Sequence, residues 1–336
     1  MQRTEQGEIA LKYCREYPDM GTLTVAKLMF KETPGRWKTI EASRTLLRNY
    51  RGQLGKKSLK HLGTTEAVKG NGDARRSSTD PSLPPSDVKI LIYDLETSPI
   101  NAYVWQCYKT NVAPQALMEQ TQVLCWAAKW LGSDEVMFDS KEGEDDDARV
   151  CCTMYELFNE ADIVVAHNGD NFDAKILNTR WVLAGFPPPQ PYQSVDTLTI
   201  ARKNFRFPMN KLDVIGRYLD LGKKVSHEGF DLWIKVMADD HDAWKRMEEY
   251  NVQDVVLDEA VYLKLRAWDR RHPNMQVIVG GDGMRCITCG STALHEINKP
   301  SRTSASEFPS YRCEGCGKVM RGRSRYVPDA PTKDRL

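Results

Sequence analysis

Two acidic side chains, Asp94 and Glu96, follow directly on a largely apolar segment, Val88–Tyr93. This segment is expected to form a buried strand, and side chains at i and i+2 of a strand point to the same face of the sheet. Two neighbouring carboxylates repel each other unless a cation lies between them, and hard divalent cations take oxygen ligands. The pair is therefore a candidate metal site, although an Asp-x-Glu at a strand end is on its own more often a solvated turn.

A second group of polar residues stands at a predicted strand-to-helix junction, Val165–Asp173 (VAHNGDNFD). Asp173 falls in the first turn of the helix predicted over Phe172–Ala184, where the helix dipole favours a carboxylate without any ligand. Asp170 could cap the same helix instead. From its position alone, Asp173 is either a metal ligand or an ordinary acidic residue at a helix start.

A third pair, Tyr250 and Asp254, lies within a long helix predicted from about Asp242. Positions i and i+4 share a helix face, so the phenol and the carboxylate address one site. Tyr and Asp at this spacing are also common on solvated helices. The pair therefore gains meaning only together with the other two motifs.

In this order, the three motifs resemble those of the DEDDy subgroup of DnaQ-like 3′→5′ exonucleases. These have the RNase H fold and include the proofreading domains of family B DNA polymerases. The resemblance covers about Asp87–Trp268 and includes Asp196–Arg202 (DTLTIAR) and Asn210–Asp213 (NKLD). It implies an α/β fold, an RNase H-like mixed sheet flanked by helices. It also implies phosphodiester hydrolysis with two Mg²⁺ or Mn²⁺ ions.

The resemblance implies a role for each residue of the three motifs. Asp94 would bridge the two ions, and Glu96 and Asp254 would hold the ion that activates water. Asp173 would help to hold the scissile phosphate, through the outer sphere or the second ion. Tyr250 would orient the attacking water.

Other polar residues near these motifs carry weaker expectations. Asn168 and Phe172, from the second motif, are candidate nucleic-acid contacts. Asp196 is expected to cap a helix rather than to bind a metal. His167 and His227 lack ligand spacing and are given no metal role.

Four of the nine cysteines form two CxxC pairs, Cys286 with Cys289 and Cys313 with Cys316, separated by 23 residues. This spacing is typical of a structural zinc site with four thiolate ligands, and a redox pair or disulfides are the alternative. Gly290 and Gly317 follow the pairs, as expected where the backbone turns tightly around sulfur. A closed four-thiolate site leaves no open coordination position, so the zinc is expected to fold a ribbon over residues 280–325 rather than to catalyse.

The segments before the exonuclease motifs predict a helical domain and a linker. Residues 1–51 are expected to form three short helices that resemble a helix-turn-helix, with Arg44, Arg48 and Arg51 on one face of the third. That face could contact nucleic acid, or belong to a small helical bundle with a solvated basic surface. Residues 52–86, rich in Gly, Ser, Thr, Pro and Lys, are expected to be a flexible linker.

The exonuclease domain is expected over residues 87–272, and residues 326–336 are expected to be a tail. Besides Val88–Tyr93, the strand candidates of this domain are Ala102–Tyr108, Gln122–Trp130, Glu135–Asp139 and Ile163–Ala166. Strands followed by alternating strands and helices indicate a sheet with helices packed on it.

Charge is distributed unevenly along the chain. Residues 1–80 hold 16 Lys and Arg against 9 Asp and Glu, residues 81–264 hold 18 against 30, and residues 265–336 hold 13 against 7. An acidic middle between basic ends fits carboxylates gathered for metals beside surfaces that attract a polyanion. Three domains that differ in charge by drift are the alternative.

The sequence shows no apolar signal core, and no apolar run reaches the roughly 20 residues that a membrane helix needs. An intracellular, cytoplasmic protein without membrane contact is therefore expected. The order of helical head, exonuclease domain and zinc ribbon resembles exonucleases encoded by bacteriophages, which act in a bacterial host. The expected function is removal of nucleotides from a single-stranded 3′ end of DNA, with a DNA polymerase or another replication or repair protein as a partner. An RNA exonuclease, a binding protein with an inactive nuclease fold, and a regulator built on the N-terminal helices are the alternatives.

Overall fold

The computed structural model describes residues 9, 10, 12, 13, 16, 22–33, 47, 83–85, 88–141, 147–222 and 229–325. The chain divides into two compact units, Met1–Gly72 and Asp73–Leu336. Several predictions lie outside the described residues: those for Arg44, Arg48, Arg51, His227, most of the linker and the tail 326–336.

The described part of the first unit is helical. Helix α2 (Thr22–Glu32) includes Thr24–Phe30, the second of the three predicted helices. One small apolar cluster is formed by the buried side chains Ala10, Tyr13, Val25, Ala26, Met29 and Leu47. The Tyr13 hydroxyl donates a hydrogen bond to Glu32 Oε2 at 2.6 Å. The helix-turn-helix arrangement of this unit stays a prediction.

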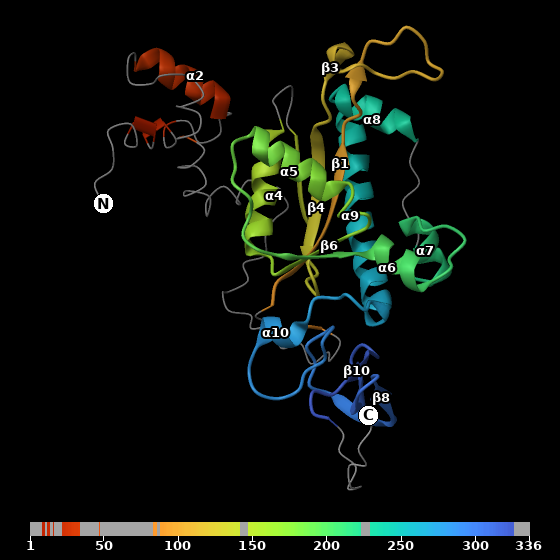
Figure 1. Ribbon diagram of the computed structural model, residues 1–336. Helices are drawn as coiled ribbons and strands as arrows, with labels where there is room; N and C mark the ends of the chain where they lie inside the picture. The colour runs from red at the N-terminus through yellow and green to blue at the C-terminus, as the bar shows by residue number, and fades with distance from the viewer. Residues whose placement is uncertain are drawn as a thin grey trace. The chain divides into compact units, whose positions relative to one another are not determined.

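The second unit is built on a mixed five-stranded sheet with the strand order β5-β4-β1-β6-β7 (Figure 1). Its strands are β1 (Ile90–Thr97), β4 (Val123–Trp130), β5 (Met137–Ser140), β6 (Ile163–Ala166) and β7 (Gln193–Asp196). The central strand β1 pairs antiparallel with β4 and parallel with β6. The predicted α/β class with a mixed sheet is confirmed.

One predicted strand, Ala102–Tyr108, was wrong. Only Asn101–Ala102 (β2) is extended and paired, with β3 (Leu117–Glu119) as its partner, and the short helix η2 (Pro114–Ala116) precedes β3. The aromatic and β-branched residues Tyr103, Val104 and Trp105 suit a pleated, half-buried surface. Here the segment lies against neither a partner strand nor an apolar core, so its side chains stay exposed.

Helices cover both faces of the sheet, because its central strand alternates apolar side chains between two cores. Along β1, Ile90 and Ile92 belong to one core, and Leu91, Tyr93 and Leu95 belong to the other. The first core is completed by α6 (Thr197–Asn204), α7 (Leu212–Tyr218) and α9 (His241–Leu265). The second is completed by α4 (Ala148–Glu160) and α5 (Asp173–Leu183).

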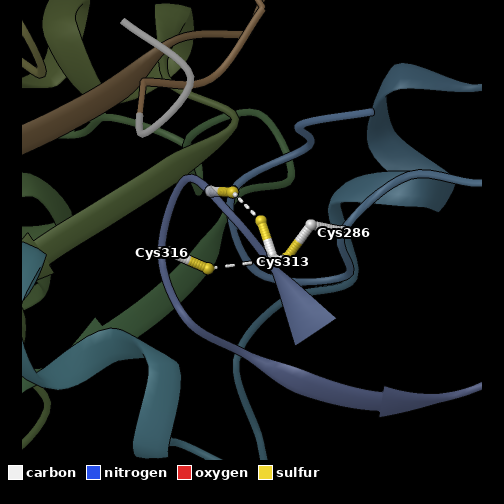
Figure 2. Close-up of side chains that lie close together, drawn as sticks. Cys286, Cys313 and Cys316 are labelled. Carbon is white, nitrogen blue, oxygen red and sulfur yellow. Dashed lines mark hydrogen bonds between the residues drawn. The ribbon is translucent and has the colours of Figure 1, made fainter. Parts of the chain in front are cut away.

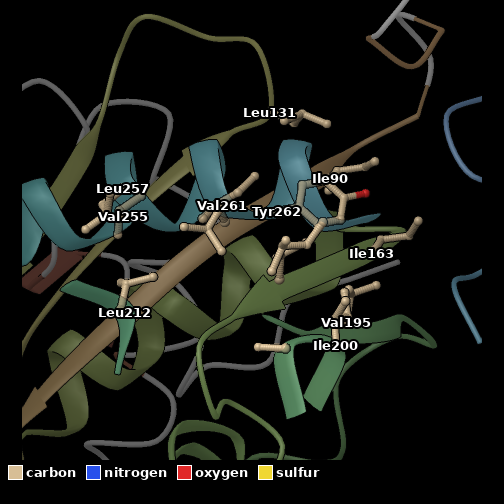
Figure 3. Packing of buried hydrophobic residues seen from close by; sticks show 14 of the residues in the cluster. Ile90, Leu131, Ile163, Val195, Ile200, Leu212, Val255, Leu257, Val261 and Tyr262 are labelled. Atoms are coloured by element: carbon tan, nitrogen blue, oxygen red, sulfur yellow. The ribbon is translucent and has the colours of Figure 1, made fainter. Parts of the chain in front are cut away.

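Helix α9 runs along the first face of the sheet and presents its apolar side to it (Figure 3). Asp240 caps its start by accepting a hydrogen bond from Ala243 N at 2.8 Å. Helix α7 packs closely on α9 at Gly216, where a Cβ would stand 2.7 Å from Leu257 Cδ1. Helix α8 (Phe230–Met237) packs against the first half of α9. None of the described helices is both long and apolar enough to cross a membrane.

The C-terminal part contains a three-stranded antiparallel sheet in the order β10-β9-β8. Its elements are η3 (Arg266–Trp268), α10 (Met275–Val279), β8 (Leu294–Arg302), β9 (Glu307–Cys313) and β10 (Val319–Arg321). Two hydrogen bonds join the segment after α9 to the cysteine-bearing segments: Met275 N donates to Ile287 O at 3.0 Å, and the Lys318 side chain donates from Nζ to Asp269 O at 2.5 Å.

His272 lies in this connecting segment and is held as a neutral imidazole. Its Nδ1 donates to Pro273 O at 2.8 Å, because a carbonyl only accepts, and its Nε2 accepts from the Tyr262 hydroxyl at 2.8 Å. The Tyr262 and His272 rings are also stacked, with centroids 5.9 Å apart. Burial lowers the pKa of His272 to about 4.

This environment predicts a loss of stability at mildly acidic pH. Because the pKa of His272 is lower in the folded state than in the unfolded state, its contribution is present above the unfolded value of about 6.5 and is lost as the pH falls toward about 4. We expect the free energy of unfolding of the wild type, relative to that of His272→Asn, to fall by on the order of 3 kcal/mol between pH 7 and pH 4. Urea titrations of both proteins at each pH measure this difference. A difference that stays constant with pH would contradict the assignment.

Candidate active site

Three carboxylates from two elements meet on the face of the sheet that α9 covers. Asp94 and Glu96 share the side of β1 on which Ile92 packs into the first core, and Asp254 is on α9. One carboxylate oxygen from each of the three residues lies within 4.8 Å of the others. Asp254 is buried, whereas Asp94 and Glu96 are partly exposed. The structure thus brings together three of the predicted metal ligands.

The strand beside these acids leaves them room. Asp94 lies opposite Ala127 and Glu96 lies opposite Cys125 on β4, and the register of the pair shifts between Glu96 and Thr97. Such an irregularity re-aims side chains, and it is common beside functional sites. Burial, and then the charges of Glu96 and Asp94, raise the pKa of Cys125 well above its usual value. This thiol therefore stays protonated and is a neutral neighbour of the acids.

Asn251 is a site residue that the sequence analysis missed. Its side chain is completely buried on α9, and Nδ2 donates a hydrogen bond to Asp94 Oδ2 at 2.7 Å. It stands three residues before Asp254 and so shares the inward face of the helix. The amide can orient the Asp94 carboxylate without adding charge. The available signal was its place beside Tyr250, inside the third motif.

The Asp173 carboxylate contacts a backbone N–H of β1 and is not part of the cluster of three carboxylates. It is the first residue of α5 and is 3% exposed, and its Oδ1 accepts a hydrogen bond from Leu95 N at 3.3 Å. Asp173 thus contacts the peptide between Asp94 and Glu96. Burial raises its pKa to about 7, against the opposing effect of hydrogen bonds from backbone groups. Asp170 accepts a hydrogen bond from the Ser194 hydroxyl and does not cap α5.

The turn between β6 and α5 is shaped by two residues of the second motif. Asn168 has a positive φ of 73°, and its N–H donates to Asp196 Oδ1 at 3.1 Å. At Gly169, a Cβ would lie 2.6 Å from the Ala166 Cβ and 3.1 Å from the Tyr93 hydroxyl, so only glycine fits. Asp196 also accepts from Thr199 N at 3.1 Å and caps α6, which confirms its expected role.

A hydrogen-bonded chain that was not foreseen passes through His167. His167 Nε2 donates to the Asn210 carbonyl at 2.9 Å, and Nδ1 lies 2.9 Å from Thr197 Oγ1. The Thr197 hydroxyl in turn donates to Asp258 Oδ1 at 2.7 Å. Burial raises the pKa of Asp258 to about 7. The chain ties the end of β6 to α6, to α9 and to the segment before α7, so it fixes one wall of the site.

The carboxylates open into a pocket of about 620 Å³. Tyr250 lines this pocket, and its ring packs edge-on against Trp233 at a centroid distance of 6.1 Å. Two exposed basic residues, Arg202 and Lys211, line it as well. Arg202 belongs to the sequence motif DTLTIAR, and Lys211 belongs to the motif NKLD. An acidic floor with cationic side chains at its edge suits a ligand that carries phosphate.

The candidate nucleic-acid contacts of the second motif lie in different places. Asn168 lines the pocket of the carboxylates. Phe172 is 44% exposed and lines a second pocket of about 290 Å³. The remaining lining of that second pocket is Gln120, Thr121, Asn171, Lys175, Ile176, Thr179 and Arg180.

The four cysteines of the CxxC pairs converge in the C-terminal part, and their sulfur atoms lie within 4.8 Å of one another. Figure 2 shows Cys286, Cys313 and Cys316 gathered around one point. The Sγ–Sγ distances are 3.6 Å between Cys286 and Cys316 and 3.5 Å between Cys289 and Cys313. Side-chain hydrogen bonds with Cys289 and Cys316 lower the pKa of Cys286 well below its usual value, which favours a thiolate.

The two clusters suit different ions. Four sulfurs around a zinc ion at about 2.3 Å would lie about 3.8 Å apart, close to the spacing of this cluster. Gly290 and Gly317 have positive φ values of 77° and 79°, the tight turns that the sequence predicts after each pair. The carboxylate cluster instead offers hard oxygen donors on one side of a pocket, which suits Mg²⁺ or Mn²⁺.

Comparisons with known proteins give the following similarities. Residues 118–266 match the family model RNase_H_2, described as the RNase_H superfamily. A comparison with curated protein sequences found no match. Among solved structures, the chain is similar to the family B DNA polymerase from the hyperthermophilic archaeon Pyrobaculum calidifontis, with 19% sequence identity and a TM-score of 0.41. This similarity covers 59% of the chain and 28% of the polymerase chain.

The family match includes Asp173, Tyr250 and Asp254 and begins after β1, the strand that carries Asp94 and Glu96. Strand β1, at the centre of the mixed sheet, brings Asp94 and Glu96 to the cluster that contains Asp254. This α/β architecture is an RNase H-like fold, and the chain carries the RNase H superfamily match over residues 118–266.

Proposed function

We propose that this protein is a metal-dependent 3′→5′ exonuclease that removes nucleotides from DNA. The observation that carries the proposal is the meeting of Asp94, Glu96 and Asp254 within 4.8 Å at the floor of a 620 Å³ pocket. The match to the RNase H superfamily supports nuclease chemistry at this place in the fold. Direction and preference for DNA follow from the resemblance of the three motifs to proofreading exonucleases.

In this proposal, Asp94, Glu96 and Asp254 hold two divalent cations. When bound, such cations stabilise the charge on the attacking and leaving oxygens of a phosphodiester. Asn251 orients the Asp94 carboxylate through its hydrogen bond at 2.7 Å. Asp173 holds the backbone between Asp94 and Glu96 through Leu95 N. By the resemblance, it would help to hold the scissile phosphate through the outer sphere or the second cation.

The remaining pocket residues would act on substrate and water. Tyr250 lines the pocket four residues before Asp254 on the same helix face, where its hydroxyl can orient the attacking water. Arg202 and Lys211 can pair with phosphates of the strand. Asn168 lines the same pocket and can donate to a phosphate or a base.

We further propose that Cys286, Cys289, Cys313 and Cys316 hold one structural zinc ion. Four sulfurs would fill all four positions of a tetrahedral zinc ion, so this site would fold the chain around it and take no part in hydrolysis. The C-terminal part carries Arg302, Arg312, Arg321, Arg323 and Arg325, which are candidate contacts for nucleic acid or protein. A DNA polymerase or another replication or repair protein is a candidate partner.

The experiment that tests this function uses purified protein with a 5′-labelled single-stranded DNA and an RNA of matched sequence, in Mg²⁺, in Mn²⁺ and in EDTA. We expect a ladder of products that shortens from the 3′ end, depends on the metal and forms faster on DNA. A circular single-stranded DNA is the control, because an exonuclease leaves it intact.

Three outcomes would change the proposal. Cleavage of the circle would assign an endonuclease. A faster ladder on RNA would assign an RNA exonuclease. Binding without cleavage of either polymer by folded protein would assign a nucleic-acid-binding protein on an inactive nuclease fold.

A further inference from the structure

An exposed loop leaves the sheet at the end of β1, directly after the strand that carries Asp94 and Glu96. Its base is closed by hydrogen bonds, from Ser98 N to Gln122 O at 2.9 Å and from Tyr103 N to Ala116 O at 3.0 Å. Strands β2 and β3 pair at this base. In Figure 1 the loop projects away from the sheet beyond β3. The loop, residues 98–118, is therefore a supported projection at the end of the catalytic strand.

The loop presents three aromatic rings to solvent, Tyr103 beside its base and Trp105 and Tyr108 farther along the chain. Tyr103 is 74% exposed, Trp105 is fully exposed and Tyr108 is 75% exposed. The aliphatic side chains of the loop that are exposed, such as Val104 at 46% and Val112 at 38%, are less accessible than each of these rings. Large rings contribute most to stability when buried, so three exposed rings on one supported loop favour a binding role.

The charge of the loop suits a polyanion. Residues 98–118 contain one charged side chain, Lys109, and no acidic residue, although residues 81–264 as a whole hold 30 acidic residues against 18 basic ones. The next residue, Glu119, is an exposed acid at the base of the loop, where it lies opposite Asn101. Lys109 Nζ lies 5.3 Å from the centre of the Tyr108 ring. A strand of phosphates can therefore pass the rings without meeting a carboxylate of the loop.

The chain continues from this loop to a second surface of the same character. After β3, Gln120 and Thr121 line the second pocket, of about 290 Å³, together with Phe172 and Lys175. The lining residues of this pocket include no acid, and Phe172 directly precedes Asp173. The path from the rings through this pocket thus ends beside the acid that contacts β1.

From these observations we infer that Tyr103, Trp105 and Tyr108 form a stacking surface for the bases of single-stranded nucleic acid. The bases pack on the rings, and the backbone runs past the second pocket toward the carboxylates. Aromatic side chains are suited to this because every base has a flat face, whatever its sequence. The inference deepens the proposed function, since the strand held here is the substrate of the carboxylate site.

The test measures binding separately from cleavage. Fluorescence anisotropy is followed with a 5′-labelled 16-nucleotide dT strand and with an abasic strand of the same length. The full chain carries Asp94→Asn, so that no chelator is needed and the cysteine site stays intact. On this background we compare Trp105→Ala, Trp105→Leu and Trp105→Phe. The matched control is Tyr218→Ala, because Tyr218 is 63% exposed on α7.

Stacking predicts an order of affinities that simple apolar contact does not. We expect Trp105→Ala and Trp105→Leu to bind dT about tenfold more weakly and Trp105→Phe to stay within about threefold of the parent. Tyr218→Ala should not change binding. The abasic strand should bind all variants equally, since it has no bases to stack.

Other results would overturn the inference. If Trp105→Leu binds dT as tightly as the parent, the loop makes an apolar contact and not a stack. If all variants bind dT equally, or the parent does not bind dT, the rings serve another partner, such as a protein.

Cleavage assays with the wild-type carboxylates separate this inference from the proposed function. If the Trp105 variants cleave DNA as fast as the wild type, the proposed exonuclease function stands and the stacking surface is refuted. If binding of dT depends on the rings but the wild type does not cleave DNA, the stacking surface stands and the exonuclease function is refuted.

Discussion

Asp94→Asn is expected to lower the metal-dependent rate of phosphodiester hydrolysis by about a thousandfold or more and to leave the fold intact. The substitution removes one negative charge from the three carboxylates that lie within 4.8 Å of one another, and so weakens cation binding. Asparagine keeps the shape of the side chain and can still accept the hydrogen bond from Asn251 Nδ2. The rate is measured in single turnovers on a 5′-labelled strand in Mg²⁺ and in Mn²⁺.

The stability of this variant provides an internal check. Removing one of three neighbouring negative charges relieves repulsion in metal-free protein, so the melting temperature should stay the same or rise. Asp220→Asn is the matched control, because Asp220 is an exposed residue with a positive φ of 55°, which asparagine tolerates well. It should keep full activity. If Asp94→Asn keeps more than about a tenth of the wild-type rate, Asp94 does not hold an essential metal ion.

Tyr250→Phe gives a graded comparison for the same site. The substitution removes the hydroxyl but no ligand charge, and the ring can keep its edge-on packing against Trp233. A group that only orients water should cost about ten- to a hundredfold in rate, less than the loss of a metal ligand. A rate as low as that of Asp94→Asn would give Tyr250 a larger role than orientation.

Removal of the metal from the cysteine cluster is expected to unfold the C-terminal sheet and to leave the five-stranded sheet folded. The apolar cluster around the cysteines contains little besides the sulfurs and Leu294, so hydrophobic burial contributes little to stability there. Structural zinc contributes roughly 10–16 kcal/mol to the folding of small domains of this kind. We expect one zinc per chain, and loss of amide protection in β8, β9 and β10 when it is removed.

Hydrogen exchange with and without a chelator measures this effect, and Cys289→Ser should reproduce it in the presence of zinc. Cys107→Ser is the matched control, because Cys107 is exposed and lies outside the cluster. Its amide protection should equal that of the wild type. If the C-terminal sheet keeps its protection after the metal is removed, zinc is not what folds it. An unreduced mass lower by four hydrogens would show two disulfides instead.

The strands and helices around the site were predicted well where their residues follow a local rule. The segment Val88–Tyr93 is continuously apolar except for Lys89, and it overlaps strand β1 at the centre of the sheet. The helix expected to follow the second motif is α5, and Asp173 begins it. The segment Ala102–Tyr108 followed the same pattern of strand-forming residues and was wrong. A segment forms a strand of a sheet only if a partner strand and an apolar core lie beside it. The sequence of the segment alone does not show whether they do.

The residues around the acids were harder to predict because they act across long distances in the chain. Asn251 and Asp94 are separated by 157 residues, and the hydrogen bond of Thr197 to Asp258 spans 61 residues. An asparagine or a threonine inside a helix has many ordinary roles, and nothing in its immediate sequence indicates its partner. The position of Asp173 on the Leu95 backbone, apart from the three other acids, has the same origin.

The sequence by itself determined which side chains can meet at short range. The spacing of Asp94 and Glu96 on a strand puts them on one face, Tyr250 and Asp254 share a helix face, and the CxxC pairs bring their sulfurs together in tight turns. Only the tertiary structure decided that α9 covers the face of β1 with the two acids, so that Asp254 joins them. It also decided that the aromatic loop stays in solvent. The physical reason is that backbone geometry over a few residues is a local property, whereas burial and partnership depend on which distant segments pack together.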